Sequence, residues 1–253
     1  MTGTSAVVFV HGAWHGPWCW SDWVDAAEAM GLEAVAVTLP SHDRPGSSTR
    51  IWTRMAEMIT AVSKAISDCT GPTVIVGHSM GGYLAQRVLE RPHHQVVGAA
   101  LVAPIPRRGL AATTIRMVRR SPGPALRALL TADLYRAVGT PDLCRAAFFT
   151  PETPETTVSS TLGRLQNESS AALPPMLVRW SRPDRIGTPV IVLAPERDGL
   201  FSVDQQRDLG RAYGVDPIVI AGAGHDLMLE PQGLEAADLV LRWAGDRLAE
   251  AAA

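Results

Sequence analysis

Residues 73–88 read TVIVGHSMGGYLAQRV, and this stretch decides the fold. Its first four residues, Thr73–Val76, are β-branched, and such a run predicts a strand that is buried on both faces. From Gly82 onward the pattern is that of a helix. Between the strand and the helix lies the pentapeptide Gly77-His78-Ser79-Met80-Gly81. The sequence therefore places one serine, between two glycines, at the turn from a strand into a helix.

A serine in this position has the setting of a nucleophile held by a tight turn. The turn forces Ser79 into a strained backbone conformation, and side chains at Gly77 or Gly81 would collide with the adjoining strand and helix. The first N–H groups of the helix also point toward the space above the serine. The pentapeptide alone is a weak signal, because glycine-rich chains contain it by chance. Strand, turn and helix together favour a nucleophile over a purely structural turn.

The composition of the whole chain is that of a globular protein with one large core. It has 253 residues, of which 46% are hydrophobic and 19% charged, and its net charge is −2. These values argue against a disordered or a nucleic-acid-binding protein. The start lacks a secretory leader pattern, no apolar run reaches membrane-spanning length, and the three cysteines form no CxxC pair. We therefore expect a cytoplasmic protein without a membrane anchor, a metal or a nucleic-acid partner, and the sequence leaves open whether it forms a homodimer.

Six runs of residues predict strands. They are Ala6–Val10, Glu33–Thr38, Thr73–Val76, Val96–Val102, Thr188–Leu193 and Pro217–Ala221. Helical patterns such as Trp52–Ile66 and Gly82–Glu90 lie between the early strands. This alternation predicts an α/β fold with a mostly parallel six-stranded sheet flanked by helices, and with ligands at the carboxyl ends of the strands.

From about Pro104 to Ile186 the alternation of strands and helices stops. This stretch holds several prolines and no convincing strand. Its helical segments are Leu110–Arg120, Ala125–Leu130 and Pro141–Phe148. We expect a helical cap, residues 105–186, inserted into a core made of residues 1–104 and 187–253.

A serine hydroxyl needs a base that takes its proton, and the base needs an acid that orients it. Among seven histidines, His225 directly follows the last predicted strand, behind Gly222 and Gly224. We expect His225 to be the base, and the alternative is a loop histidine bonded to a backbone carbonyl. His11 and His15 have the H-x-x-x-H spacing of a metal site, but that spacing converges only on a helix, and they lie in a glycine-proline loop.

The acid is expected in the loop after the fifth predicted strand, which reads APERDG. Asp198 is the first choice, because the turn Asp198-Gly199 can bring its carboxylate toward the carboxyl edge of the sheet. Glu196 is the runner-up. Either residue could instead be a solvated loop charge.

The oxyanion hole of such a site needs two backbone N–H groups that point at the developing negative charge. Met80, next to the nucleophile, is expected to supply one, and Ala13, in the loop after the first strand, the other. We place three further residues around the substrate pocket. Gly12 would let the backbone approach the substrate, Trp14 would form part of the pocket wall, and His78 lies inside the turn with its side chain directed away from the Ser79 hydroxyl.

Four segments of the chain resemble the α/β-hydrolase superfamily. They read VVFVHGAWHGPWCW, VIVGHSMGGYLAQRV, VIVLAPERDGLFS and GAGHDLMLEP, and the resemblance covers nearly the whole chain. Ser79, Asp198 and His225 also follow one another in the Ser–acid–His order of that fold. Within the superfamily the chain is most similar to the esterase branch that contains plant methylesterases and hydroxynitrile lyases. The resemblance implies catalysis without a cofactor by Ser79, His225 and Asp198.

The resemblance also separates ester hydrolysis from cyanohydrin cleavage. In the lyase members a threonine follows the loop histidine and a lysine follows the catalytic histidine, whereas this chain has Gly12 and Asp226 there. A nearby ammonium group stabilises a leaving cyanide, and Asp226 would repel that anion if it faced the pocket. We therefore expect a hydrolase that cleaves an ester, lactone or thioester bond of a small organic substrate through an acyl-enzyme.

Other functions are excluded or stay open on the same residues. A dinucleotide-binding oxidoreductase would need G-x-G-x-x-G after the first strand, where this chain has His11-Gly12-Ala13-Trp14. A biosynthetic cyclase or acyltransferase, a lyase on the same fold, and a ligand-binding receptor with a vestigial triad stay open. From Arg107 to Arg136 the cap holds seven arginines (107, 108, 116, 119, 120, 127 and 136) and a single acid, Asp133. For them a solvated face is favoured over a site that attracts an anionic substrate.

Overall fold

Six strands form one sheet in the order β2-β1-β3-β4-β5-β6, and every neighbouring pair is parallel. They are β1 (Ala6–Val10), β2 (Glu33–Val37), β3 (Thr73–His78), β4 (Val96–Val102), β5 (Val190–Pro195) and β6 (Ile218–Ile220). The computed structural model describes residues 3–42, 52–178 and 181–253. The predicted α/β sheet is confirmed, and it is wholly parallel where a mostly parallel one was expected.

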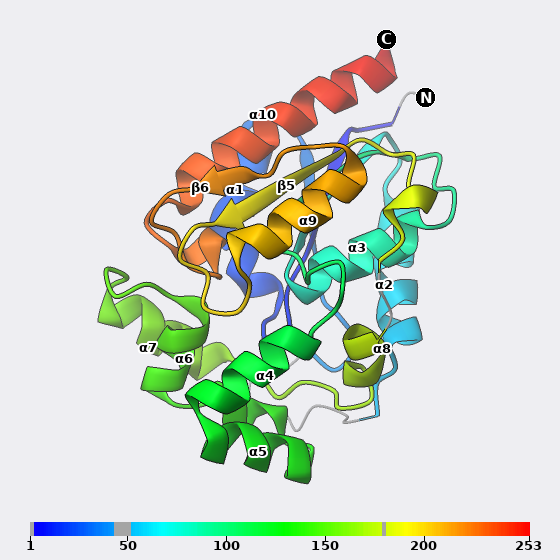
Figure 1. Ribbon diagram of the computed structural model, residues 1–253. Helices are drawn as coiled ribbons and strands as arrows, with labels where there is room; N and C mark the ends of the chain where they lie inside the picture. Colours follow the sequence, from blue (N-terminus) through cyan, green and yellow to red (C-terminus); the bar gives the residue numbers. More distant parts are fainter. Residues whose placement is uncertain (1–2, 43–51, 179–180) are drawn as a thin grey trace.

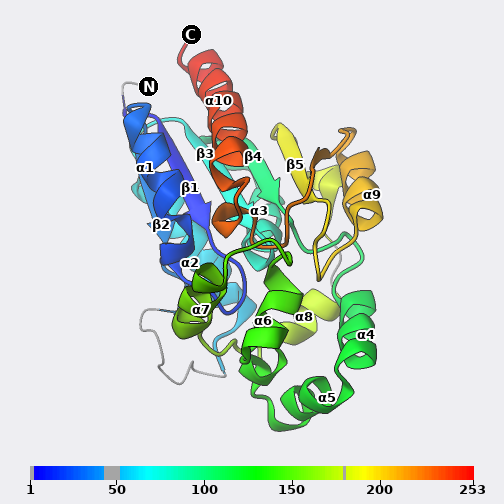
Figure 2. The ribbon, with the colours of Figure 1, turned by 90° about the vertical axis from the view of Figure 1, so that its left-hand side faces the viewer.

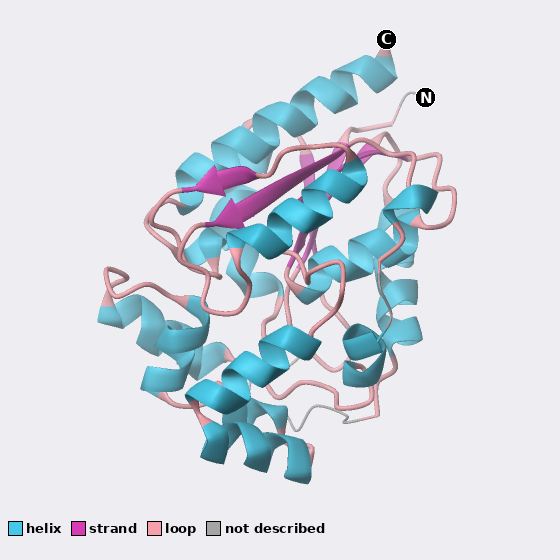
Figure 3. Ribbon diagram, viewed as in Figure 1, coloured by secondary structure: helices cyan, strands magenta, loops and turns pink. Residues whose placement is uncertain are grey.

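Helices cover both faces of the sheet, which is why the strand sequences are apolar without alternation. On one face, Val7 and Phe9 of β1 pack with α1 (Ser21–Ala29) and α10 (Gly233–Ala252). On the other face, Val8 and Val10 pack with α2 (Met55–Asp68) and α3 (Met80–Leu89). Figures 1 and 3 show the sheet between these two layers, with α9 (Val203–Tyr213) in front of β5.

The chain order changes direction between β1 and β3, because β2 lies on one side of β1 and β3 on the other. In parallel sheets the loops at such a point separate and leave a crevice at the carboxyl ends of the strands. The segment after β1 and the segment after β3 meet at this crevice, and they carry Ala13 and Ser79.

Between β4 and β5 the described residues form helices and no strand. The α-helices are α4 (Ala111–Arg120), α5 (Pro122–Thr131), α6 (Pro141–Phe148), α7 (Glu155–Arg164) and α8 (Leu173–Val178), and the short 3-10 helices are η2 (Leu134–Ala137) and η3 (Pro183–Arg185). In Figure 2 the strands run toward this helical layer, which lies beyond their carboxyl ends. The layer therefore covers the edge of the sheet where a site is expected, and we call it the cap.

The structure also bears on the expectations about membrane-spanning segments and cysteines. In the described part of the chain no helix combines the length and the apolarity that crossing a membrane requires. Cys19, Cys69 and Cys144 are buried and unpaired. Outside the cap, the described residues also form the short 3-10 helices η1 (Pro17–Trp20) and η4 (Leu227–Leu229).

Candidate active site

Ser79 lies at a strained turn between β3 and α3. Its φ of 51° and ψ of −114° fall in a region that residues with a side chain rarely adopt. Its N–H donates to the Val102 carbonyl oxygen at 3.0 Å, and its own carbonyl accepts from the Ile105 N–H at 3.2 Å. A Cβ on Gly77 would stand 2.6 Å from the Gly81 carbonyl oxygen, and a Cβ on Gly81 would overlap the Val10 carbonyl. The two glycines thus allow the close packing that holds the serine in this conformation.

His225 forms a hydrogen bond with Asp198, on the loop after β5. Its Nδ1–H donates to Asp198 Oδ2 at 2.8 Å, and both side chains are almost fully buried. The other carboxylate oxygen, Oδ1, accepts the N–H groups of Leu200 at 2.7 Å and Phe201 at 2.9 Å. Three donors therefore fix the orientation of the Asp198 carboxylate. The runner-up, Glu196, instead accepts from the Gly222 N–H, so it orients the loop and not the histidine.

Two opposing effects set the pKa of His225. Burial disfavours the charged imidazolium, but the charge of Asp198, its hydrogen bond and the more distant charge of Asp226 outweigh burial and raise the pKa above 6.5. The ring lies 4.7 Å from that of His78, which precedes Ser79, and 5.1 Å from that of Phe201. These contacts place the histidine beside the serine turn.

A cavity of about 800 Å³, including its open mouth, lies between the serine turn and the cap. Ser79, Met80, Ala13 and Trp14 line it from the core. The cap contributes mainly apolar side chains, among them Ile105, Leu110, Met117, Leu134, Leu173 and Met176. A mostly apolar concavity with a few polar groups at one end is the usual form of a small-molecule site.

Two backbone N–H groups stand beside the serine in this cavity. In the described part of the chain, neither the Ala13 N–H nor the Met80 N–H has a hydrogen-bond acceptor. Met80 is the first residue of α3, so its N–H also lies at the positive end of the helix dipole. Among the described residues nothing occupies these two donors, and the prediction that they form an oxyanion hole stays a prediction.

The expectations for Gly12 and His78 need correction, because neither residue lines the cavity. The His78 ring lies behind the site, where its Nε2–H donates to the His225 carbonyl at 3.0 Å. Burial, together with the neighbouring His225 and His15, keeps the pKa of His78 well below its usual value, so the ring is neutral. A Cβ on Gly12 would stand 2.8 Å from His78 Nδ1 and 3.1 Å from Ser79 Cβ. Gly12 thus allows the first loop to pack against the serine turn.

Asp226 does not face the cavity, which was the condition for its expected repulsion of a cyanide anion. It is fully buried, and its Oδ2 accepts from His15 Nε2 at 2.8 Å. It does not line the cavity. Asp226 therefore cannot repel a cyanide in the cavity directly. The chain still has no lysine at this position to stabilise a leaving cyanide.

One group of described side chains has the spacing of a metal site. Among the described residues, His78, His225 and Asp226 have ligand atoms within 4.8 Å of one another. His225 Nδ1 is bonded to Asp198 and His78 Nε2 to a carbonyl, so an ion could be reached only by the other ring nitrogens and the Asp226 carboxylate. His11 and His15 do not converge, since His11 Nε2 accepts from the Leu39 N–H while His15 contacts Asp226.

None of the seven cap arginines lines the cavity. Arg116 donates to the Leu200 carbonyl and Arg120 to the Ala146 carbonyl. Arg136 pairs with Asp133 at 2.8 Å. These contacts agree with the structural and solvated role that the sequence favoured over attraction of an anionic substrate.

The fold and the arrangement at the serine can be compared with known proteins. The model of the alpha/beta hydrolase family matches residues 7–237. The chain belongs to this family. As an α/β hydrolase it shares its fold with polyneuridine aldehyde esterase, whose crystal structure superimposes with a TM-score of 0.72 at 16% identity, over 95% of this chain and 99% of that one.

Curated relatives of this α/β hydrolase match over shorter stretches. A probable esterase of rice, Oryza sativa subsp. indica, named PIR7A, is 31% identical over 108 residues, which are 40% of this chain and 39% of that protein. Methylesterase 3 of Arabidopsis thaliana is 39% identical over 80 residues, or 30% of each protein. The match thus spans well under half the length of these relatives.

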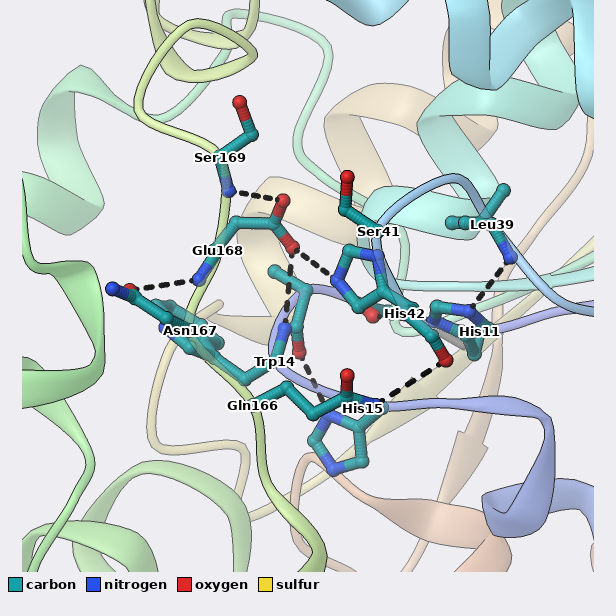
Figure 4. A network of polar contacts seen from close by, with 12 residues as sticks. His11, Trp14, His15, Leu39, Ser41, His42, Gln166, Asn167, Glu168 and Ser169 are labelled. Carbon is teal, nitrogen blue, oxygen red and sulfur yellow. Dashed lines mark hydrogen bonds and ion pairs between the residues drawn. The ribbon is translucent and has the colours of Figure 1, made fainter. Parts of the chain in front are cut away.

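The charged residue in the cavity wall, Glu168, is not predicted by any motif of the sequence. Glu168, in the cap, lines the cavity and is almost fully buried. Figure 4 shows that its carboxylate receives contacts from Trp14, His42 and Ser169. No local pattern marks this glutamate, since Trp14 and His42 lie on two other segments of the chain and only Ser169 is its neighbour.

Proposed function

We propose that this α/β hydrolase is a carboxylic ester hydrolase that uses Ser79 as a nucleophile and forms an acyl-enzyme. The observation that carries the proposal is the strained Ser79 turn, which opens into the same cavity as the free N–H groups of Ala13 and Met80. The His225–Asp198 pair beside it supports the proposal, since a serine needs such a base. The names of the partial relatives, an esterase and a methylesterase, agree with it.

The geometry supports a two-step reaction. His225 Nε2 takes the hydroxyl proton as Ser79 Oγ attacks the ester carbonyl, and the carbonyl oxygen becomes an oxyanion at the Ala13 and Met80 N–H groups. The C–O bond to the alcohol then breaks, and His225 returns its proton to the departing alkoxide. Water enters, and His225 takes one of its protons as the water oxygen attacks the acyl carbon. The acyl–serine bond then breaks, the acid leaves, and His225 returns the proton to Ser79 Oγ. Asp198 remains ionised and holds the Nδ1–H tautomer throughout.

The lining of the cavity indicates the class of substrate. The apolar cap side chains would bind an apolar acyl or alcohol group and would disfavour a charged group without a partner. The substrate is therefore a small organic ester, and a lactone or thioester would follow the same steps.

Labelling and turnover test the proposal together. A fluorophosphonate should modify Ser79, located by peptide mass spectrometry, and Ser79→Ala should lower kcat for a short-chain aryl ester by about four orders of magnitude. The control is Ser63→Ala, on α2 away from the cavity, which should retain normal kcat. Modification of another serine would contradict the assignment. Binding of esters without steady-state release of the acid would indicate a receptor instead.

A further inference from the structure

The cap holds the backbone at Trp14, the residue after the candidate oxyanion donor Ala13. Trp14 has a φ of 64°, which a residue with a side chain adopts only when its surroundings impose it. Its N–H donates to Glu168 Oε2 at 3.3 Å, its carbonyl accepts from the Gln166 N–H at 2.8 Å, and its indole N–H donates to the Leu134 carbonyl at 3.3 Å. All three polar groups of Trp14 are thus bonded to the cap.

The two peptide groups on either side of Ala13 are fixed by buried side chains. His11 Nδ1–H donates to the Gly12 carbonyl at 2.9 Å, so it orients the peptide that carries the Ala13 N–H. His15 Nδ1–H donates to the Ala13 carbonyl at 2.7 Å, on the next peptide. Glu168 binds the N–H at the other end of that second peptide. Of the three side chains that hold these two peptide groups, Glu168 is the one that comes from the cap, because His11 and His15 belong to the loop itself.

The Glu168 carboxylate is itself well held. Its Oε2 forms a hydrogen bond with His42 Nε2 at 3.2 Å, in addition to the one from the Trp14 N–H. Its Oε1 accepts the Ser169 N–H at 2.7 Å (Figure 4). The His42 Nδ1 atom lies 3.2 Å from the Pro40 carbonyl, which can only accept, so this nitrogen carries a proton. The contact between His42 Nε2 and Glu168 Oε2 thus joins the loop after β2 to the cap and fixes the orientation of the carboxylate.

We propose that Glu168 is a positioning residue for the oxyanion hole: it holds the Ala13–Trp14 peptide so that the Ala13 N–H stays directed at the substrate carbonyl. This inference rests on the proposed function, in which that N–H is an oxyanion donor. It gives the cap a part in catalysis besides covering the cavity. A misaligned donor stabilises the negative charge of the transition state less well, whereas it hardly affects binding of the neutral ester. Loss of the Glu168 contact should therefore lower kcat and leave KM unchanged.

Two substitutions and a matched control test the inference. Glu168→Gln keeps the shape but replaces one acceptor oxygen by an NH₂ group, whereas Glu168→Ala removes the contact entirely. Loss of a whole oxyanion donor lowers kcat by about 10²–10³, so we expect about tenfold for Gln and about 100-fold for Ala, with KM within twofold. The control is Glu155→Gln, an exposed cap glutamate paired with Arg145, which should leave both constants unchanged.

A second readout separates positioning from simple loss of structure. Ser79 Oγ can add to the carbonyl carbon of an aryl trifluoromethyl ketone. A C–O bond forms, the C=O π bond opens to an alkoxide at the oxyanion position, and the serine proton passes to His225. The corresponding secondary alcohol cannot form this adduct. In Glu168→Gln the inhibition constant of the ketone should rise by the same factor as kcat/KM falls, while that of the alcohol stays within twofold.

The outcomes distinguish this inference from the proposed function. Absence of turnover and of Ser79 labelling in the unmodified protein would overturn both. Normal turnover and labelling, with Glu168→Gln unchanged in kcat and in ketone binding, would overturn only the role of Glu168. A raised KM with unchanged kcat would assign Glu168 to substrate contact instead. If Glu168→Ala does not fold, as judged by circular dichroism, the isosteric glutamine variant decides.

Discussion

The substitution Asp198→Asn tests the role of the candidate acid, because the surrounding donors determine the orientation of the asparagine amide. Oδ1 of Asp198 accepts two backbone N–H groups, from Leu200 and Phe201, and Oδ2 accepts His225 Nδ1–H. An amide has only one oxygen, and the two backbone donors will hold it. The NH₂ group then faces His225 and donates to Nδ1. The ring is left with its proton on Nε2, where it cannot accept the proton of Ser79.

The size of the effect follows from the free energy needed to turn the amide over. The active tautomer requires the amide oxygen to face His225, which leaves the NH₂ group against the N–H groups of Leu200 and Phe201. Each buried donor left without an acceptor costs about 1–3 kcal/mol, so the flip costs about 2–6 kcal/mol. At about 1.4 kcal/mol per factor of ten, kcat should fall by between about 30-fold and 10⁴-fold.

The assay is steady-state hydrolysis of a short-chain aryl ester, with thermal unfolding as a check that the variant folds. The matched control is Glu196→Gln, two residues away, which keeps an acceptor for the Gly222 N–H and should stay within about tenfold of the unmodified kcat. A fall of less than tenfold for Asp198→Asn would refute the reasoning from the fixed amide. A larger effect at Glu196 would transfer the role of the acid to that residue.

Two further predictions concern the protonation of the base and the glycines. Because the pKa of His225 is raised, kcat/KM should fall as the pH drops through a midpoint above 6.5, and Asp198→Asn should move the midpoint downward; a pH–rate profile with an unmoved midpoint would contradict this. Gly81→Ala should abolish activity and lower the melting temperature, since the new Cβ would overlap the Val10 carbonyl. The control Gly163→Ala lies in open space within α7, and it should raise the free energy of unfolding in urea by about 0.5–1 kcal/mol. Equal effects of the two alanines would mean that close packing at Gly81 is not needed.

The local sequence was sufficient to predict the fold and the strained turn at Ser79, the candidate nucleophile. The strands were recognisable because a parallel sheet buried on both faces requires continuous apolar runs, and each run is a property of a few neighbouring residues. The Ser79 turn was recognisable for a similar reason, since the strand, the two glycines and the helix lie within 16 residues of one another. The positions of Asp198 and His225 followed from chain order, because loops after parallel strands meet at one edge of the sheet.

Contacts between distant segments decided the rest. The preference for Asp198 over Glu196 depends on which carboxylate the turn directs at His225, and the positions of Gly12, His78 and Asp226 depend on packing across the core. The glutamate that binds the Trp14 N–H lies 154 residues away along the chain, and His15 and Asp226 are 211 residues apart. No periodicity or motif joins residues at such separations. A buried polar group finds its partner only when the folded chain brings the two together. The contacts that hold the loop carrying Ala13 were therefore decided by the tertiary structure alone.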